Sequence, residues 1–300
     1  MLASCVFVPA VVADTSPQRV LILHQQASGF TQQLISQLQH DLSSHNIAVE
    51  SSLHNQPILQ PSAMDNYQLI IAVGSRTSKA LLDSNNNTPM LSLLMPENLA
   101  LGFAQLYPQK TGWHSLLIDQ PLERHFYLIS ALLGEQTDTG LILGQLNETL
   151  QTDYRKAANN TEHPLQIETI QQSEQLADAI KSLSQRSDVL LMSADPEIYN
   201  KNTIRSILLS SYRHRLPVIG FSKSLTHAGA IAAIYSEPEQ ISQQAVKISL
   251  QILRGEATEK AYPPDSFSVS VNYQVARSLG YRFSDEDVIV QLIKAYEKQR

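Results

Sequence analysis

Short apolar runs alternate along the chain with segments in which apolar residues recur at helical spacing. One helical stripe consists of Phe30, Leu34, Leu38 and Leu42, spaced four residues apart. The short runs lie at residues 19–23, 68–73, 89–94, 140–144, 165–170, 188–193 and 217–221. Those at 68–73 and 89–94 are apolar at nearly every position, as in strands of a parallel sheet that is covered by helices on both faces. The pattern predicts an α/β protein with parallel sheets.

Two further helices are indicated by residues at their ends. Pro121 stands where the first turn of a helix over residues 122–133 begins, and Gly134 can end that helix. Ser236 and Glu239 fit a capping box that starts a helix reaching to Gly255. An alternating strand at residues 267–271 and a helical stretch at 288–296 follow. Two series of alternating strands and helices in 300 residues predict two α/β lobes.

Composition and charge argue against some classes of function. Hydrophobic residues make up 43% of the chain and charged residues 17%, which is typical of an ordinary globular protein. The net charge of −6 and the lack of any basic run argue against nucleic acid as a partner. Beyond the first dozen residues, no apolar stretch reaches the roughly 18 residues that a membrane span needs.

The first 13 residues are apolar and uncharged, and a polar break follows at Asp14. The small residues around Ala13 fit a signal-peptidase site, so residues 1–13 are interpreted as a signal peptide and the protein as periplasmic. The usual basic segment is missing, so the true start can lie elsewhere, or the segment can be a buried strand. Cys5, the single cysteine, excludes an internal disulfide. It can also be a lipid anchor, but the apolar residues after it favour a place in the signal core.

Motifs for catalysis are missing from the sequence. Gly74 follows a strand, but neither a phosphate-binding loop nor a dinucleotide-binding glycine pattern surrounds it, and no G-x-S-x-G sequence occurs. The nine histidines form no metal-binding pair, and His125 and His214 are expected on solvated helix faces. We therefore expect no catalytic residue, no metal and no cofactor.

Polar loops recur where the strands end, and open α/β sheets bind ligands at those ends. Helix N-termini there offer free N–H groups to an anion, although Ser, Asp and Asn at such positions also serve simply as helix caps. The candidate ligand-binding residues are Ser28, Ser75, Thr77, Ser78, Asn147, Glu148, Asp195, Ser222 and Tyr235.

Four segments in the C-terminal half, residues 216–222, 229–236, 238–241 and 271–280, resemble ABC-transporter substrate-binding proteins, some of which bind aromatic amino acids. The resemblance implies the type I periplasmic binding protein fold: two Rossmann-like lobes joined by a multi-strand hinge. It implies one lobe of residues 18–113 plus 237–267 and a second of 114–236 plus 268–300, with hinges near Trp113, Ser236 and Val271.

The resemblance also implies roles for single residues. Ser75 matches a hydroxyl that contacts a ligand carboxylate, and Asn147, Glu148 and Asp195 match polar positions of the second lobe. Two positions depart from the pattern, because Met95 stands where an aspartate often holds an ammonium group and Ser236 stands at another acidic position. Both departures weaken the expectation of an amino-acid ligand.

The function implied is capture of a small ligand, an amino acid or a similar polar metabolite, between the lobes by a monomeric periplasmic protein that serves an ABC permease. The alternative is a sensing module that reports the ligand to a membrane receptor, and an α/β enzyme is the least favoured class. Neighbouring permease genes would distinguish transport from sensing.

Overall fold

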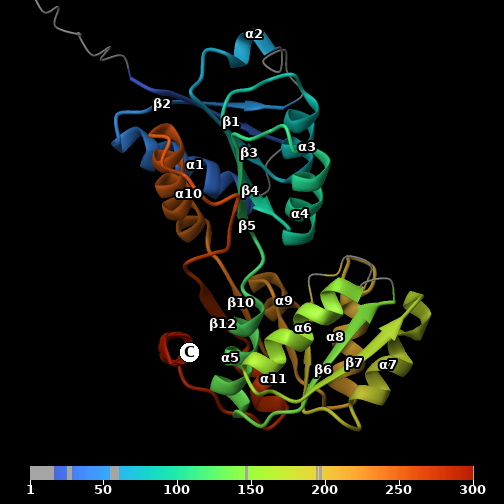
Figure 1. The fold of residues 1–300 in the computed structure, drawn as a ribbon. Coiled ribbons are helices and arrows are strands. Elements are labelled where there is room, and N and C mark those ends of the chain that lie inside the picture. Colours follow the sequence, from blue (N-terminus) through green and yellow to red (C-terminus); the bar gives the residue numbers. More distant parts are fainter. Residues whose placement is uncertain are drawn as a thin grey trace, which may run out of the picture.

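The computed structural model describes residues 17–25, 29–54, 61–145, 148–193, 195 and 198–299. Two α/β lobes lie one above the other and are joined by three chain crossings (Figure 1). Each lobe is built around one six-stranded sheet with helices on both faces. The α/β class and the two lobes predicted from the sequence are confirmed.

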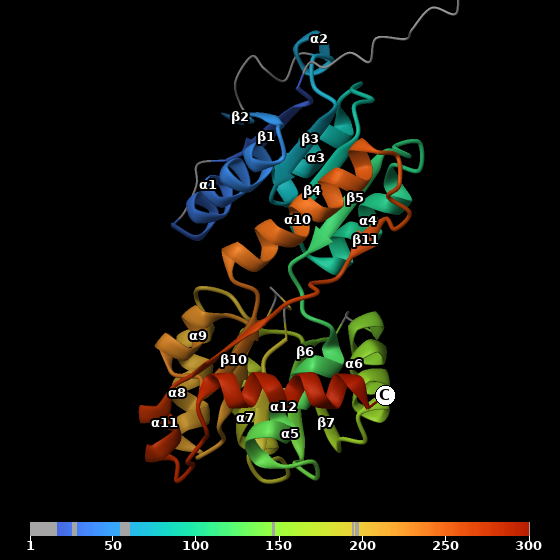
Figure 2. The ribbon, with the colours of Figure 1, turned by 90° about the vertical axis from the view of Figure 1, so that its left-hand side faces the viewer.

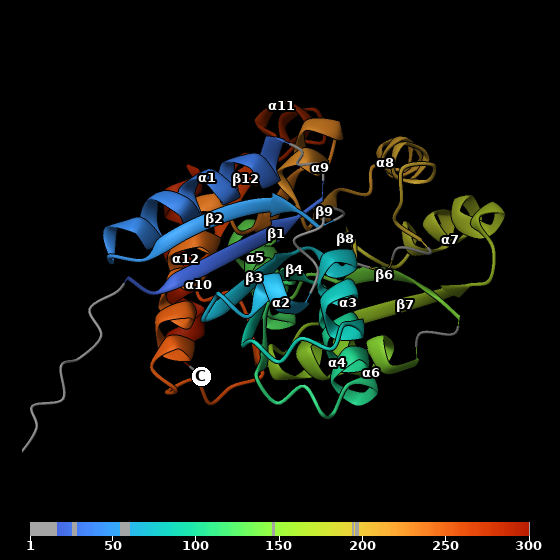
Figure 3. The same cartoon turned by 90° about the horizontal axis from the view of Figure 1, so that it is seen from above.

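The sheet of lobe 1 has the order β11-β5-β4-β3-β1-β2, with all pairs parallel. Helices α1 and α10 cover one face, and α3 and α4 cover the other (Figure 3). The strands are β1 (Arg19–His24), β2 (Ala48–Leu53), β3 (Leu69–Val73), β4 (Met90–Met95), β5 (Trp113–Leu117) and β11 (Ala261–Tyr262). The helices are α1 (Gly29–Ser44), α2 (Pro61–Met64), α3 (Ser75–Asp83), α4 (Glu97–Leu106) and α10 (Pro238–Leu253).

The sheet of lobe 2 has the order β12-β10-β9-β8-β6-β7, and only its edge strand β12 is antiparallel to its neighbour. Helices α5, α6 and α12 pack on one face and α7, α8 and α9 on the other. The strands are β6 (Thr139–Gly144), β7 (Leu165–Ile170), β8 (Val189–Leu191), β9 (Val218–Gly220), β10 (Ala232–Tyr235) and β12 (Ser268–Val271). The helices are α5 (Leu122–Leu133), α6 (Glu148–Asn160), α7 (Leu176–Leu183), α8 (Ile204–Arg213), α9 (Lys223–Ala228), α11 (Tyr273–Ser278) and α12 (Glu286–Lys298).

The three crossings follow β5, β10 and β11. The sequence places the first lobe boundary at Trp113, but strand β5 hydrogen-bonds within the sheet of lobe 1 as far as Leu117. Its backbone pairs with β4 and β11, so the chain leaves lobe 1 only at Ile118. The second crossing lies between Tyr235 and Pro238, and the third lies between β11 and β12 (Figure 2).

Buried side chains tie the three crossings together. Gln120 in the first crossing donates from Nε2 to Oγ of Ser236 in the second, at 2.8 Å. Ser236 Oγ in turn donates to the backbone oxygen of Ser266 in the third, also at 2.8 Å. The guanidinium of Arg124 donates to Gln120 Oε1 at 2.7 Å and to the oxygen of Pro264 at 3.1 Å. A hydrogen-bonded chain therefore runs through the whole hinge.

The capping box predicted at Ser236 and Glu239 is wrong by one residue. Glu237 is the N-cap of α10, it forms the capping box with Gln240, and Pro238 occupies the first helical position. Because the hydroxyl of Ser236 serves the hinge, it is not free to cap the helix.

Candidate functional site

The strand ends of the two sheets face each other across the hinge. The carboxyl end of β5 leads into lobe 2, and the other strands of that sheet run parallel to β5. Likewise β10 leads into lobe 1, and β9, β8, β6 and β7 run parallel to it. The carboxyl ends of both parallel series are therefore directed toward the opposite lobe, which is where open α/β sheets bind ligands.

In lobe 1, the candidates Ser75, Thr77 and Ser78 lie in the first turn of α3 and not in a loop. Gly74 precedes them with a φ of +89°, a left-handed conformation that lets β3 turn directly into the helix. The hydroxyl of Ser78 already has a hydrogen-bond partner within lobe 1, because it donates to the backbone oxygen of Gly74 at 3.0 Å. Thr77 is fully buried, and its Oγ1 has no hydrogen-bond partner among the described residues.

In lobe 2, Asp195 follows β8 and is 1% exposed. Its Oδ2 accepts the backbone N–H of Gly144, at the end of β6, at 3.0 Å. Since this bond joins two strand ends, replacing Asp195 by alanine would disturb folding as well as any bound ligand. Ser193, which the sequence analysis did not select, is fully buried, and within the described part of the chain its hydroxyl has no partner.

The other candidates are more dispersed. Ser28 and Asn147 lie outside the described residues. Glu148 is exposed at the start of α6. Ser222, before α9, shares a hydrogen bond of 2.9 Å with Ser224, and Tyr235 donates to Glu237 Oε1 at 3.1 Å.

Carboxylates from both lobes gather beside the first crossing. The Glu97 N–H, at the start of α4, donates to Asp119 Oδ2 at 2.7 Å, so Asp119 takes the place of a helix cap there. Burial raises the pKa of the Asp119 carboxyl. Desolvation, followed by the nearby charges of Asp119, Asp153 and Glu123, raises the pKa of Glu97. Asp153 and Glu123 belong to helices of lobe 2, so this negative region is shared by both lobes.

Tyr154 of α6 is 2% exposed and lies within electrostatic reach of Asp119 and of Asp195. Its phenol pKa is raised by burial first, and then by the charges of Asp119 and Asp195. Asp119 comes two residues after the end of β5, so the strand-end rule that selected the other candidates would also have found it.

Met95, where the resemblance suggested an ammonium-binding acid, is fully buried in the core of lobe 1. Leu94 before it has a left-handed φ of +56°, and the pairing of β4 with β5 shifts register there. This irregularity places the methionine with the core residues. The carboxylates near this strand end are instead those of Glu97 and Asp119.

The expectation of a solvated helix face for His125 is wrong. The residue is 4% exposed, and burial, with a contribution from the Arg124 charge, lowers its pKa to about 4. Within the described ranges, no three or more His, Cys, Asp or Glu side chains lie close enough together to hold a metal ion. No helix in the described part of the chain is both long and apolar enough to span a membrane.

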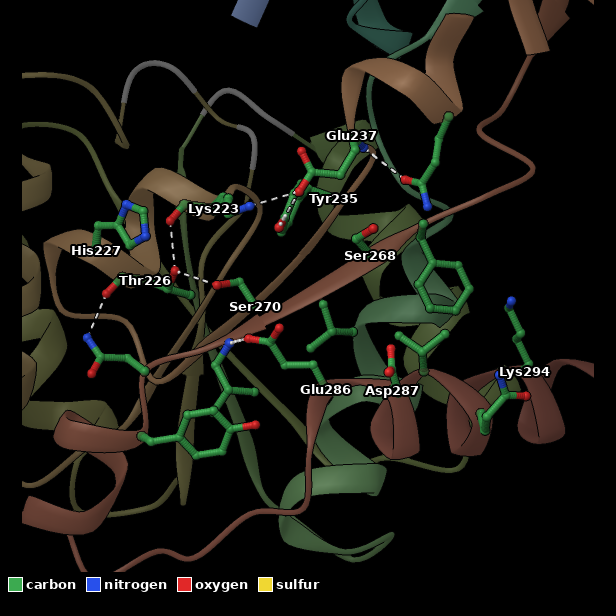
Figure 4. A pocket seen from close by; sticks show the side chains of 18 residues that line it. Lys223, Thr226, His227, Tyr235, Glu237, Ser268, Ser270, Glu286, Asp287 and Lys294 are labelled. Atoms are coloured by element: carbon green, nitrogen blue, oxygen red, sulfur yellow. Dashed lines mark hydrogen bonds and ion pairs between the residues drawn. The ribbon is translucent and has the colours of Figure 1, made fainter. Parts of the chain in front are cut away.

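A cavity of about 910 Å³ lies at the edge of lobe 2, beside β12 (Figure 4). Of the predicted site residues, Tyr235 lines it. Lys223 pairs with Glu237 there at 3.0 Å, and Figure 4 shows Tyr235 directed at the same carboxylate.

Comparison with known proteins identifies the family. The profile of the family described as "ABC transporter substrate binding protein" matches residues 23–292. A comparison with curated proteins finds no match.

Several solved structures share the fold at low sequence identity. A ligand-free, open substrate-binding protein with adhesive properties from Clostridium difficile has a TM-score of 0.72 at 16% identity, covering 90% of this chain and 97% of that one. A conserved domain protein from Vibrio cholerae has a TM-score of 0.62 at 16% identity, over 91% and 98% of the two chains. A Streptococcus pneumonia ABC domain in complex with L-Trp has a TM-score of 0.61 at 12% identity, over 92% and 98%.

Proposed function

Because the chain belongs to the family of ABC transporter substrate-binding proteins, we propose that it captures a small polar metabolite with an amino group between its lobes and delivers it to an ABC permease. The lobes close about the three crossings and enclose the ligand, as hinge-bending binding proteins do. The proposal places the protein in the periplasm.

The observation that carries the proposal is a pair of unsatisfied hydroxyls, one in each lobe. Thr77 follows β3 and Ser193 follows β8, both are fully buried, and neither hydroxyl has a partner among the described residues. A buried polar group left unpaired costs about 1–3 kcal/mol, so such groups normally have a partner. Both lie near strand ends directed toward the opposite lobe, and we propose that lobe closure on the ligand lets it supply the missing hydrogen bonds.

The carboxylates beside the first crossing favour a positively charged group on the ligand. Asp119 and Glu97 have raised pKa values because they are desolvated and, for Glu97, near other acids. An ammonium group would relieve this repulsion and form charge-assisted hydrogen bonds. The relative from Streptococcus pneumonia is in complex with L-Trp, which carries such a group. In this proposal, Asp119 takes the role of the ammonium-binding aspartate, whose usual position is occupied here by Met95.

A thermal-shift screen of amino acids, amines, nucleosides, sugars and organic acids tests the proposal. A ligand that binds only the folded state raises the melting temperature, so we expect at least one amino-bearing metabolite to do so. Thr77→Val and Ser193→Ala should keep the unligated melting temperature and lose most of the ligand-induced shift.

Ser249→Ala is the matched control, because Ser249 in α10 is also fully buried with its hydroxyl unpaired in the described structure. This variant should keep the full ligand-induced shift. A screen without any shift, or strand-end variants that retain it, would contradict the proposal.

A further inference from the structure

We propose a second small-molecule site in lobe 1, which binds an aromatic monocarboxylate of single-ring size. The site is a cavity of about 140 Å³ at the amino ends of the strands, between α3 and the loops that precede β4 and β5. We call it the amino-end cavity. The site proposed between the lobes lies at the opposite, carboxyl ends of the same strands, so this inference does not depend on what that site binds.

Three neighbouring strands form an apolar floor for the cavity. Ile70 of β3 pairs with Met90 of β4, which in turn pairs with Trp113 of β5, so the three side chains share one face of the sheet. Leu81 and Leu82 of α3 line the cavity over this face, and all five side chains are buried. A ring on this floor contacts the Trp113 indole and the Met90 thioether, both of which favour aromatic partners.

Lys110 brings a positive charge to the other side of the cavity. Its Nζ donates to the backbone oxygens of Ser84 at 2.7 Å and of Asn86 at 2.6 Å, which fixes the ammonium beside the cavity that Lys110 lines. An ammonium group has three protons, so one remains for a ligand. In the described part of the chain, no acidic residue lines the cavity and no carboxylate pairs with Lys110. The charge of the lining therefore favours an anion.

Asn86 offers a second donor beside Lys110. The residue is 7% exposed, and its Oδ1 accepts the N–H of Thr88 at 2.5 Å, which fixes the amide group. Its Nδ2 is buried and has no hydrogen-bond partner among the described residues, whereas buried donors are normally paired. A carboxylate can accept hydrogen bonds from both Asn86 and Lys110, and those from Lys110 are charge-assisted.

The size and lining of the cavity favour one ring over ordered water. An apolar cavity of about 150 Å³ holds a benzene molecule, so about 140 Å³ has room for a single ring. A buried water needs about two to four polar partners, which the apolar floor does not offer. The exposed residues Asn87, Gln109 and Thr111 also line the cavity, so its polar side opens to solvent and a carboxylate can extend there from the ring.

The test is a calorimetric titration of the whole chain with benzoate, compared with benzamide, which has the same shape without the charge. We expect benzoate to bind at least about ten-fold more tightly, because only its carboxylate forms a charge-assisted bond with Lys110. Trp113 is the only tryptophan of the chain, so a change in its emission on adding benzoate locates the ligand at this cavity.

Asn86→Asp removes the Nδ2 donor and places a carboxylate beside the ammonium, while an oxygen remains to accept the Thr88 N–H. This variant should bind benzoate at least about ten-fold more weakly. Asn85→Asp is the matched control: it makes the same change of charge one residue away, at an exposed position outside the cavity lining, and should bind within about two-fold of the wild type.

Lys110→Gln gives an independent variant, because it removes the charge and keeps a donor for the loop oxygens. It should bring the affinity for benzoate down to that for benzamide. Four results would each overturn the inference: no binding of benzoate, binding that leaves the Trp113 emission unchanged, full affinity in Asn86→Asp or Lys110→Gln, or an equal loss in Asn85→Asp.

Discussion

Arg124 is the residue on which the hinge contacts converge. Its side chain is 7% exposed, and besides its bonds to the first and third crossings it pairs with Glu297 of α12 at 2.6 Å. Its guanidinium also lies 4.5 Å from the ring centre of Phe267. A lysine has neither the planar fork nor the reach to replace these contacts.

Removing this guanidinium should therefore be costly. Arg124→Met leaves Glu297, Gln120 and the oxygen of Pro264 without their donor, and we expect a loss of about 3 kcal/mol in the free energy of unfolding, measured with urea.

The matched control is Arg186→Met, which removes a more exposed ion pair with Glu168. Such surface pairs contribute under about 1 kcal/mol, so this variant should be nearly as stable as the wild type. Equal losses in the two variants would show that Arg124 does not join the crossings.

At the scale of elements, the start of α4, the first crossing and α6 together form the acidic region between the lobes. Asp119 accepts the first N–H of α4, and its pKa is raised by burial. A raised pKa means that Asp119 binds its proton more tightly in the native state than in the unfolded chain. The contribution of protonated Asp119 to the free energy of unfolding is therefore complete below the unfolded pKa of an aspartate, about pH 4, and is lost as the pH rises through the raised native pKa.

Asp119→Asn tests this assignment. The amide oxygen can still accept the Glu97 N–H, but the charge at this partly buried position is gone. The variant should become more stable relative to the wild type as the pH rises from about 4 to 7, measured by urea unfolding at each pH. It should also weaken the binding of an amino-bearing ligand. A stability difference that stays constant over this range would contradict the role of the Asp119 charge.

The sequence predicts a strand well where both of its faces are packed in the core, because every position must then be apolar. The apolar runs at β3 and β6 are buried on both faces, and their strands lie where the pattern places them. Strand β2 could not be found in this way, because it is an edge strand and every one of its residues is at least partly exposed. Polar residues were harder to assign. Ser236 fits a helix cap in the sequence, but its bonds to Gln120 and Ser266 depend on segments far away in the chain.

At the scale of the whole molecule, two lobes with facing strand ends are joined by a buried hinge (Figure 1). The candidate site residues Thr77 and Ser193 lie near the ends of buried parallel strands, which hold them in place within each lobe. In the proposed function, movement of one lobe relative to the other is the motion that brings Thr77 and Ser193 to the same ligand.

A distance between the lobes tests this account most directly. In a Cys5→Ser background, Gln105→Cys on α4 and Lys156→Cys on α6 place two dyes on exposed positions of opposite lobes, for energy-transfer measurements on single molecules. A pair at Lys156→Cys and Lys181→Cys lies within lobe 2 and serves as the control. Adding L-tryptophan, or the metabolite with the largest thermal shift, should shorten the distance between lobes and leave the control distance unchanged. A bound ligand that leaves both distances unchanged would contradict capture by lobe closure.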